Sequence, residues 1–316
     1  MIDEVTITNL YTAVERVFDK DNSEFLLDDD GITIEELKSN YNTYSVYGKL
    51  GKQMDEPQLS SGIKITLTGW IIHTYMTTLD DKKQQLVKFF NPLHKLNLRF
   101  KDRQIQGYVQ SFPKFGASRK ENNDLFCKFQ VTIFCPDPSF KVLTKSGFAI
   151  QMAAPSPYVP PEGYVLKRLN DDDVLLVDYA GTLSTPIRAT FNPNPFISGG
   201  TWTEAGVKIQ QLYVEPGTNS YSLSKIVGEF ATQSITLGEK RLYTSEPPAP
   251  GWYGFNQNDE VISKYSEMDQ TKPEFLYLNP GINALRLVDT TDASLSCYTV
   301  LIDFQEAYAY PKEVWG

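Results

Sequence analysis

Four prolines within seven residues, at positions 155, 157, 160 and 161, constrain this chain more than any other feature of its sequence. A proline has a fixed φ angle and no backbone N–H, so a run of prolines cannot continue a helix or a central strand. We therefore expect a semi-rigid connector over residues 153–163. The predicted organisation is a first domain over 1–152 and a second domain over 164–316.

Aromatic residues and turn-forming residues are both abundant. The 316-residue chain contains 18 Tyr and 18 Phe beside 20 Gly and 19 Pro. Aromatic residues favour strands, whereas glycine and proline favour turns, so this composition predicts many short strands instead of a helical bundle. With 41% hydrophobic residues the chain can bury a sizeable core. We expect a mainly β protein.

Two features predict a soluble protein that is made and folds in a cytosol. No apolar stretch approaches the roughly 20 residues needed to span a bilayer, so no membrane partner is expected. The chain begins Met1-Ile2-Asp3-Glu4, with acids where a secretory signal has a basic region and an apolar core.

Two strands of the first domain are indicated by alternation. Residues 63–68 alternate apolar and polar, and after Gly69 the apolar positions shift to Trp70 and Ile72. This shift predicts a half-buried strand with a bulge at the glycine. Residues 127–133 keep one parity throughout and predict a second strand.

One short helix is expected between those strands, over residues 80–90. Acids at its start precede strong helix formers, and Asn91-Pro92 ends it. Residues 33–36 resemble a capping box, but the residues after them support a helix poorly, so the structure of that segment stays open.

The second domain is predicted to consist of short strands bounded by Gly, Pro, Asn or Asp, as in a β-sandwich or jelly roll. The expected strands are 174–179, 187–191, 207–213, 234–237, 275–278, 282–288 and 298–304. Residues 246–272, with several prolines and polar residues, indicate a long loop that leaves the sandwich, and loops of this length usually bind something or are disordered.

The charge is unevenly distributed along the chain. Residues 1–60 carry a net charge of −8, residues 61–150 carry +8 and residues 151–316 carry −9. The total of −9 argues against specific nucleic-acid binding, which needs a dominant basic face. The two opposite blocks could neutralise each other within one domain, or the basic part of one subunit could meet an acidic part of its neighbour in a ring.

Motifs for catalysis or cofactor binding are absent from the sequence. The chain has two histidines, His73 and His94, and no HExxH, GxGxxG, phosphate-loop or GxSxG motif. Asp28-Asp29-Asp30-Gly31 resembles a calcium loop but would place leucines where carboxylates are required. Asp171-Asp172-Asp173 is interpreted as a turn. We expect no catalytic residue, cofactor or metal.

The three cysteines have no metal-ligand spacing. Cys127 and Cys135 would lie on one face of a single strand about 26 Å apart, so they cannot pair with each other. Together with Cys297 they are expected to be buried free thiols.

Trp202, Trp252 and Tyr253 leave a carbohydrate function open. Aromatic faces on a β-sandwich could stack on a sugar ring, but they could equally pack under a loop or in a protein interface. A glycan hydrolase with two paired carboxylates also stays open, because the distance between such residues is a property of the fold.

Four runs of sequence resemble the distal tail proteins of long-tailed phages of Gram-positive bacteria. They are FFNP at 89–92, RQIQGYVQ at 103–110, FQVTIFCPDPSF at 129–140 and FLYLNPGIN at 275–283. The resemblance covers residues 1–152 well and the second domain more loosely.

The resemblance implies a ring-forming first domain with a β-sandwich, one helix and an extended belt or hairpin, followed by a galectin-like β-sandwich that points outward. It implies a virion protein at the distal end of the tail, synthesised in the bacterial host cytoplasm, with no enzymatic activity. The implied assembly is a hexameric ring, possibly stacked, that joins the tail tube protein to the tail-tip spike protein. The galectin resemblance concerns the fold, so no sugar-binding residue is transferred.

The 246–272 segment is the expected docking element for a receptor-binding protein or another peripheral baseplate protein. We expect Trp252, Tyr253 and Phe255 to be its exposed aromatic anchors, since aromatic residues dominate protein hot spots. The alternative is a carbohydrate-binding module or adhesin that recognises a host cell-wall glycan.

Overall fold

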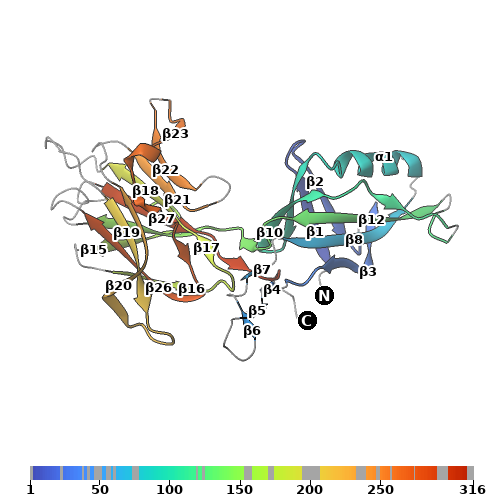
Figure 1. Cartoon of the computed structure of the whole chain (residues 1–316). Helices are drawn as coiled ribbons and strands as arrows, with labels where there is room; N and C mark the ends of the chain where they lie inside the picture. The colour runs from blue at the N-terminus through green and yellow to red at the C-terminus, as the bar shows by residue number, and fades with distance from the viewer. Residues whose placement is uncertain are drawn as a thin grey trace. The chain divides into compact units, whose positions relative to one another are not determined.

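The computed structural model divides the chain into two compact units (Figure 1). Unit 1 comprises Met1–Leu143 and Tyr308–Gly316, and unit 2 comprises Thr144–Ala307. The protein is mainly β, as predicted. The structure describes residues 3–21, 24–37, 39–40, 43–45, 52–54, 58–59, 62–72, 78–118, 120–122, 125–152, 159–169, 174–193, 207–232, 240–246, 250–256, 258–273, 275–289 and 298–311.

Unit 1 is a closed β-barrel. Seven strands follow one another in the order β12-β8-β3-β2-β1-β9-β10, and β10 pairs with β12 to close the sheet. They are β1 (Glu4–Asn9), β2 (Val14–Asp19), β3 (Phe25–Ile34), β8 (Ile63–Ile72), β9 (Lys95–Phe100), β10 (Arg103–Val109) and β12 (Phe126–Cys135). Three short strands extend this sheet: β11 (Lys114–Phe115), β13 (Phe140–Val142) and β28 (Ala307–Tyr308).

The closure corrects the expectation of a sandwich in the first domain. Tyr108 and Val109 at the end of β10 pair with Phe134 and Ile133 of β12. Gly107 allows this approach, because a Cβ there would lie 2.7 Å from the carbonyl oxygen of Phe134. With that pairing the sheet closes on itself, and its inward side chains share one core.

The outward position of Trp70 and Ile72 corrects a second expectation. Burial alternates along the whole of β8, and Ile71 is buried while Trp70 and Ile72 are half-exposed. The irregular register lies on the neighbouring strand β3, between Leu27 and Ile32. Gly69 keeps its place in the ladder, so the apolar parity changes in the sequence without a bulge in β8.

The predicted helix is α1 (Leu79–Phe89). The Thr78 hydroxyl accepts a hydrogen bond from the Asp81 N–H and caps its first turn. The rings of Phe89 and Phe90, at its end, lie 6.3 and 5.6 Å from the ring of Phe18 in the core of unit 1. Residues 33–36, left open by the sequence, include the end of β3 and form no helix.

A long hairpin joins β3 to β8. Two nested two-stranded ladders form it, β4 (Ser39–Asn40) with β7 (Gln58–Leu59) and β5 (Thr43–Ser45) with β6 (Lys52–Met54). In the described part of the chain, no helix is long and apolar enough to cross a membrane.

Unit 2 is a sandwich of two sheets around one apolar core, as expected for the second domain. The seven-stranded sheet has the order β15-β14-β27-β18-β21-β22-β23 and the five-stranded sheet β16-β26-β19-β20-β24, while β17 and β25 form a separate pair. Their bounds are β14 (Ser146–Met152), β15 (Tyr164–Leu169), β16 (Leu175–Tyr179), β17 (Thr185–Pro186), β18 (Arg188–Pro193), β19 (Val207–Val214), β20 (Tyr221–Thr232), β21 (Arg241–Thr244), β22 (Gly251–Phe255), β23 (Val261–Ser263), β24 (Met268–Pro273), β25 (Tyr277–Leu278), β26 (Gly281–Asp289) and β27 (Tyr298–Phe304).

The compact units differ from the domains expected from the prolines. β14, expected to end the first domain, pairs in parallel with β15 and antiparallel with β27 inside unit 2. The proline-rich segment therefore connects two neighbouring strands of one sheet. Two parallel strands need a connection that returns from the end of the first strand to the start of the second. Residues 153–158 of that segment lie outside the described residues, as do the strand expected at 234–237 and the turn at 171–173.

Candidate docking site in unit 2

The segment 246–272 is built largely of regular structure and is not the irregular loop that the prolines indicate. β22 and β23 form an antiparallel hairpin at the edge of the seven-stranded sheet. A 3-10 turn, η1 (Tyr265–Glu267), then leads into β24 at the edge of the other sheet. Figure 1 shows the hairpin, in orange, projecting from the sandwich.

Trp252 is a core residue, which corrects its expected role as an exposed anchor. Its side chain is 1% exposed. Its ring lies 5.5 Å from the rings of both Phe191 and Phe230, which come from the two facing sheets. Successive residues of a strand point to opposite faces, and β22 directs Trp252 inward. This position also removes Trp252 as a platform for sugar stacking.

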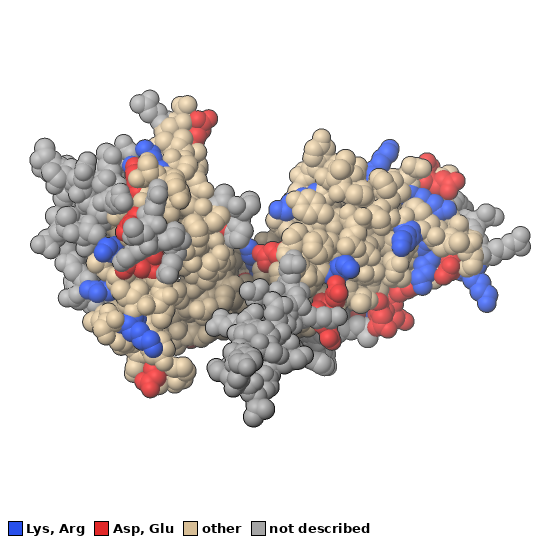
Figure 2. Space-filling view, in the orientation of Figure 1, with Lys and Arg blue, Asp and Glu red and all other residues tan. Residues whose placement is uncertain are grey.

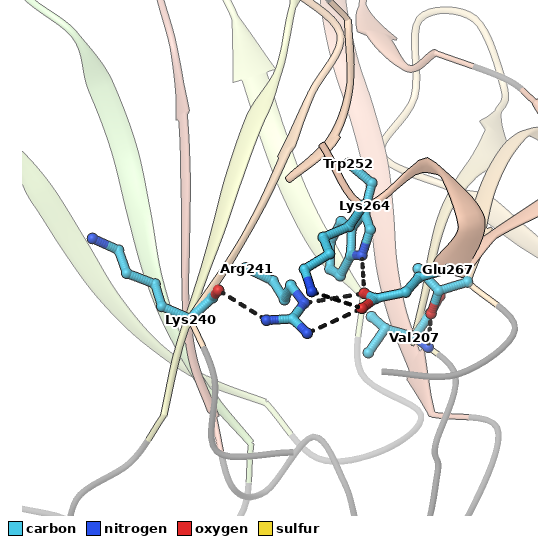
Figure 3. A network of polar contacts seen from close by, with 7 residues as sticks. Val207, Lys240, Arg241, Trp252, Lys264 and Glu267 are labelled. Carbon is cyan, nitrogen blue, oxygen red and sulfur yellow. Dashed lines mark hydrogen bonds and ion pairs between the residues drawn. The ribbon is translucent and has the colours of Figure 1, made fainter. Parts of the chain in front are cut away.

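The Glu267 carboxylate anchors the segment to the sandwich (Figure 3). The Arg241 guanidinium donates to both of its oxygens, from Nε and from one terminal nitrogen, at 3.1 Å each. The indole N–H of Trp252 donates to Glu267 Oε2 at 2.8 Å, and the Lys264 ammonium lies 3.8 Å from Oε1. Because the Arg241 side chain is fully buried, this two-pronged contact neutralises a charge inside the protein.

Tyr253 and Phe255 lie on the opposite face of β22 from Trp252 and are partly exposed. Phe255 pairs with Val261 across the hairpin, and the Lys240 ammonium lies 4.3 Å from the centre of the Phe255 ring. Two of the three expected anchors are therefore accessible from solvent.

The most exposed apolar side chains of the segment are ones that the sequence analysis did not select. Val261 is 54% exposed, Ile262 40% and Tyr265 59%. Val261 pairs with Phe255 and therefore lies on the same face of the hairpin as Tyr253 and Phe255, and we call these three side chains the hairpin patch. The sequence did contain a signal for this strand: the β-prone run Val-Ile-Ser at 261–263, which follows a polar turn.

Asn256 fixes the tip of this hairpin. Its Oδ1 accepts hydrogen bonds from the backbone N–H groups of Asn258 and Glu260, and its Nδ2 donates to the Glu260 carboxylate at 2.7 Å. A patch held in this way loses little conformational entropy when a partner binds.

The side chains considered for catalysis or metal binding are buried or contact other side chains of unit 1. Cys127 and Cys135 are buried free thiols, as predicted, and burial raises the pKa of both. His94 contacts the Asn9 amide. Asp28 pairs with Lys128. Within the described ranges, no three His, Cys, Asp or Glu residues are grouped to hold a metal, while Cys297, His73 and Trp202 lie outside those ranges.

No family model and no curated protein matches the sequence. Among solved structures, the Dit protein of phage SPP1, described as a paradigm of the hub adsorption apparatus in phages that infect Gram-positive bacteria, is similar in fold. It matches with a TM-score of 0.58 and 12% identity over 96% of this chain and 98% of that chain. Two structures of the phage P2 baseplate in its activated conformation, one with Ca and one with Sr, give TM-scores of 0.46 and 0.44 at 12% identity. They cover 97% and 96% of this chain and 98% of each matched chain. The match to the SPP1 Dit protein confirms the expected resemblance to distal tail proteins at the level of the fold.

Proposed function

We propose that this chain is a structural hub protein at the distal end of a phage tail. In this proposal unit 1 forms a hexameric ring, alone or stacked, that joins the tail tube protein to the tail-tip spike protein. Unit 2 is the galectin-like outer domain. The observation that carries the proposal is the fold shared with the SPP1 Dit hub protein across nearly all of both chains.

The positions of three of the four resembling sequence runs agree with the same proposal. The run at 103–110 covers β10, and the run at 129–140 covers most of β12, so both belong to the strands that close the barrel. The run at 275–283 forms a turn in which the Asn283 side chain bonds the backbone of Asn279 and Gly281. These runs therefore lie in the closing strands of the barrel and in a hydrogen-bonded turn of unit 2.

The ring is tested by the mass of the purified chain in solution. Light scattering at moderate salt should give six times the monomer mass, or a multiple of that value. Contacts between charges are strongest at low salt. A strictly monomeric species at high concentration and low salt would overturn the proposed function.

The hairpin patch is the proposed docking site for a receptor-binding or other peripheral baseplate protein. Its apolar side chains are exposed on a fixed turn, which suits a protein hot spot. In an assay with the purified peripheral protein of the same phage, Val261→Asp should abolish binding and leave the oligomeric mass unchanged. If the variant instead keeps this partner but loses binding to purified cell-wall polysaccharide, the outer domain is a carbohydrate-binding module.

A further inference from the structure

An apolar knob projects from one end of the barrel of unit 1. Tyr11, in the turn between β1 and β2, is 79% exposed, and Leu93, in the turn after α1, is 87% exposed. The ring of His94 stacks on the ring of Tyr11 with a centroid distance of 4.5 Å, which joins the two turns. We call Leu10, Tyr11 and Leu93 the knob.

Asn9 holds the knob in one arrangement. This side chain is fully buried, and its Oδ1 accepts hydrogen bonds from the backbone N–H groups of Tyr11 and Thr12. Its Nδ2 donates to the carbonyl of Phe89 at 2.8 Å and contacts His94 Nδ1 at 3.0 Å. The knob is therefore preformed, and an exposed preformed apolar group is suited to binding.

An apolar groove of about 380 Å³ lies on the wall of the same barrel. It is lined by Leu26, Trp70, Ile72, Lys120, Leu125 and Phe126. The outward parity of β8 places Trp70 in the groove, and Leu125, 67% exposed, stands at its edge.

Polar contacts fix the wall of this groove. The Trp70 indole N–H donates to the Asp28 carboxylate, and Lys128 pairs with the same carboxylate at 3.1 Å. The Lys128 ammonium also lies 5.3 Å from the centre of the Trp70 ring. The groove is thus preformed, as the knob is.

The knob and the groove lie at opposite ends of the strands. The knob follows Asn9, the last residue of β1, whereas the groove includes Leu26, which pairs with Asp19 at the far end of β2. Figure 1 shows the β1–β2 turn and the start of β12 at opposite ends of unit 1. A knob therefore cannot reach the groove of its own copy.

The two ends also differ in charge. Residues 10–16 and 88–95, beside the knob, contain three basic side chains and one acidic side chain. The described residues beside the groove, 19–21, 24–29, 80–83, 120–122 and 125–128, contain eight acidic and five basic side chains. Acidic side chains gather over β3 in Figure 2. Opposite net charges favour the approach of one end to the other.

We infer that the knob of one copy of this chain inserts into the groove of the next copy. A contact between two different surfaces is heterologous, and repeating it gives a closed ring when the rotation allows closure. The inference rests on the proposed ring and specifies its side-chain contact.

Two variants with opposite defects test this contact. Leu93→Asp places a charge on the knob, and Leu125→Asp places one at the edge of the groove. Both side chains are exposed, so neither change should unfold unit 1, which circular dichroism will verify. Leu223→Asp is the matched control, because Leu223 is an exposed leucine, 48% accessible, in unit 2.

Sedimentation should show rings for the wild type and the control and monomers for each variant alone. Mixing the two variants restores one intact knob and one intact groove, so the mixture should give one-to-one pairs and nothing larger. If the wild type forms rings and both variants also form them, the inference is wrong while the proposed function stands. If the wild type forms no ring, the proposed function fails as well.

Discussion

Unit 1 and unit 2 are both built of β-strands, but they differ in whether their sheets have free edges. The barrel of unit 1 closes through β10 and β12. Both sheets of unit 2 stay open and end at β15, β23, β16 and β24. Closure removes the edges of the seven barrel strands, so among the described residues of unit 1 free edges belong only to short additional strands and to the β4–β7 hairpin, whereas in unit 2 they belong to both main sheets.

The two cores differ in their polar content. In unit 1, buried polar side chains such as Asn9 and Lys82 bond backbone carbonyls at the ends of elements. In unit 2 a buried arginine and a glutamate connect β21 to η1. Unit 2 therefore contains an ion pair with a fully buried guanidinium, for which unit 1 has no described counterpart.

The largest expected effect comes from cutting the chain at the proline-rich segment. A fragment of residues 164–316 lacks β14, whose Ile150 is fully buried and which separates β15 from β27. We expect that fragment to be unfolded and a fragment of residues 144–307 to unfold cooperatively, as measured by circular dichroism in urea. If both fragments unfold cooperatively, β14 is dispensable for folding and the proline-rich segment marks the domain boundary.

Removing the charged contact of unit 2 should have the next largest effect. Glu267→Ala leaves the guanidinium of Arg241 buried without its carboxylate, which typically costs about 3 kcal/mol or more. Urea unfolding of the full chain should show a lower midpoint for unit 2 and an unchanged midpoint for unit 1. Glu260→Ala, at the exposed hairpin tip, is the control and should shift neither. Equal shifts in both units would mean that they do not unfold separately.

Alkaline pH should destabilise the core of unit 1 through the buried thiol of Cys135. Burial raises the pKa of the Cys135 thiol from 9.0 to about 12. The unfolded chain releases this proton near pH 9 while the native chain retains it, so the free energy of unfolding should fall with pH across that window. The loss is about 2 kcal/mol by about pH 10.5.

Urea midpoints at pH 8 and about pH 10.5 measure this loss. Cys135→Ala is the comparison, because it lacks the titrating thiol and should lose less stability between the two values. Burial also raises the pKa of Tyr243 in unit 2, and both chains keep that contribution. An identical decline in the two chains would contradict the assignment to Cys135.

The smallest expected effect concerns the helix. Thr78→Ala removes the hydroxyl that caps α1, which typically costs about 1 kcal/mol. The unfolding midpoint of unit 1 should fall and that of unit 2 should not. Thr218→Ala, in an exposed turn of unit 2, should leave both midpoints unchanged. A shift of unit 2 by the helix variant would show that the units stabilise each other.

Local patterns in the sequence determined the strands and the helix. Alternation predicted β12, a short β-prone run bounded by turn residues predicted β27, and the acidic start and the Asn91-Pro92 stop predicted α1. These features depend on neighbours within a few residues, because the side-chain period of a strand or helix is set by the backbone itself. The same locality explains why Cys127 and Cys135 could be assigned as buried thiols.

Tertiary structure decided which strands pair and which faces are covered. Barrel closure depends on a contact between Gly107 and Phe134, which are far apart in the sequence. The proline-rich segment reads as a boundary, yet it joins two strands whose parallel pairing no local pattern encodes. Trp252 and Trp70 each follow a glycine in a strand, but one is buried between two sheets and the other lines an outer groove. The sequence cannot separate these cases, because burial depends on what packs over each face, and the covering strands come from distant parts of the chain.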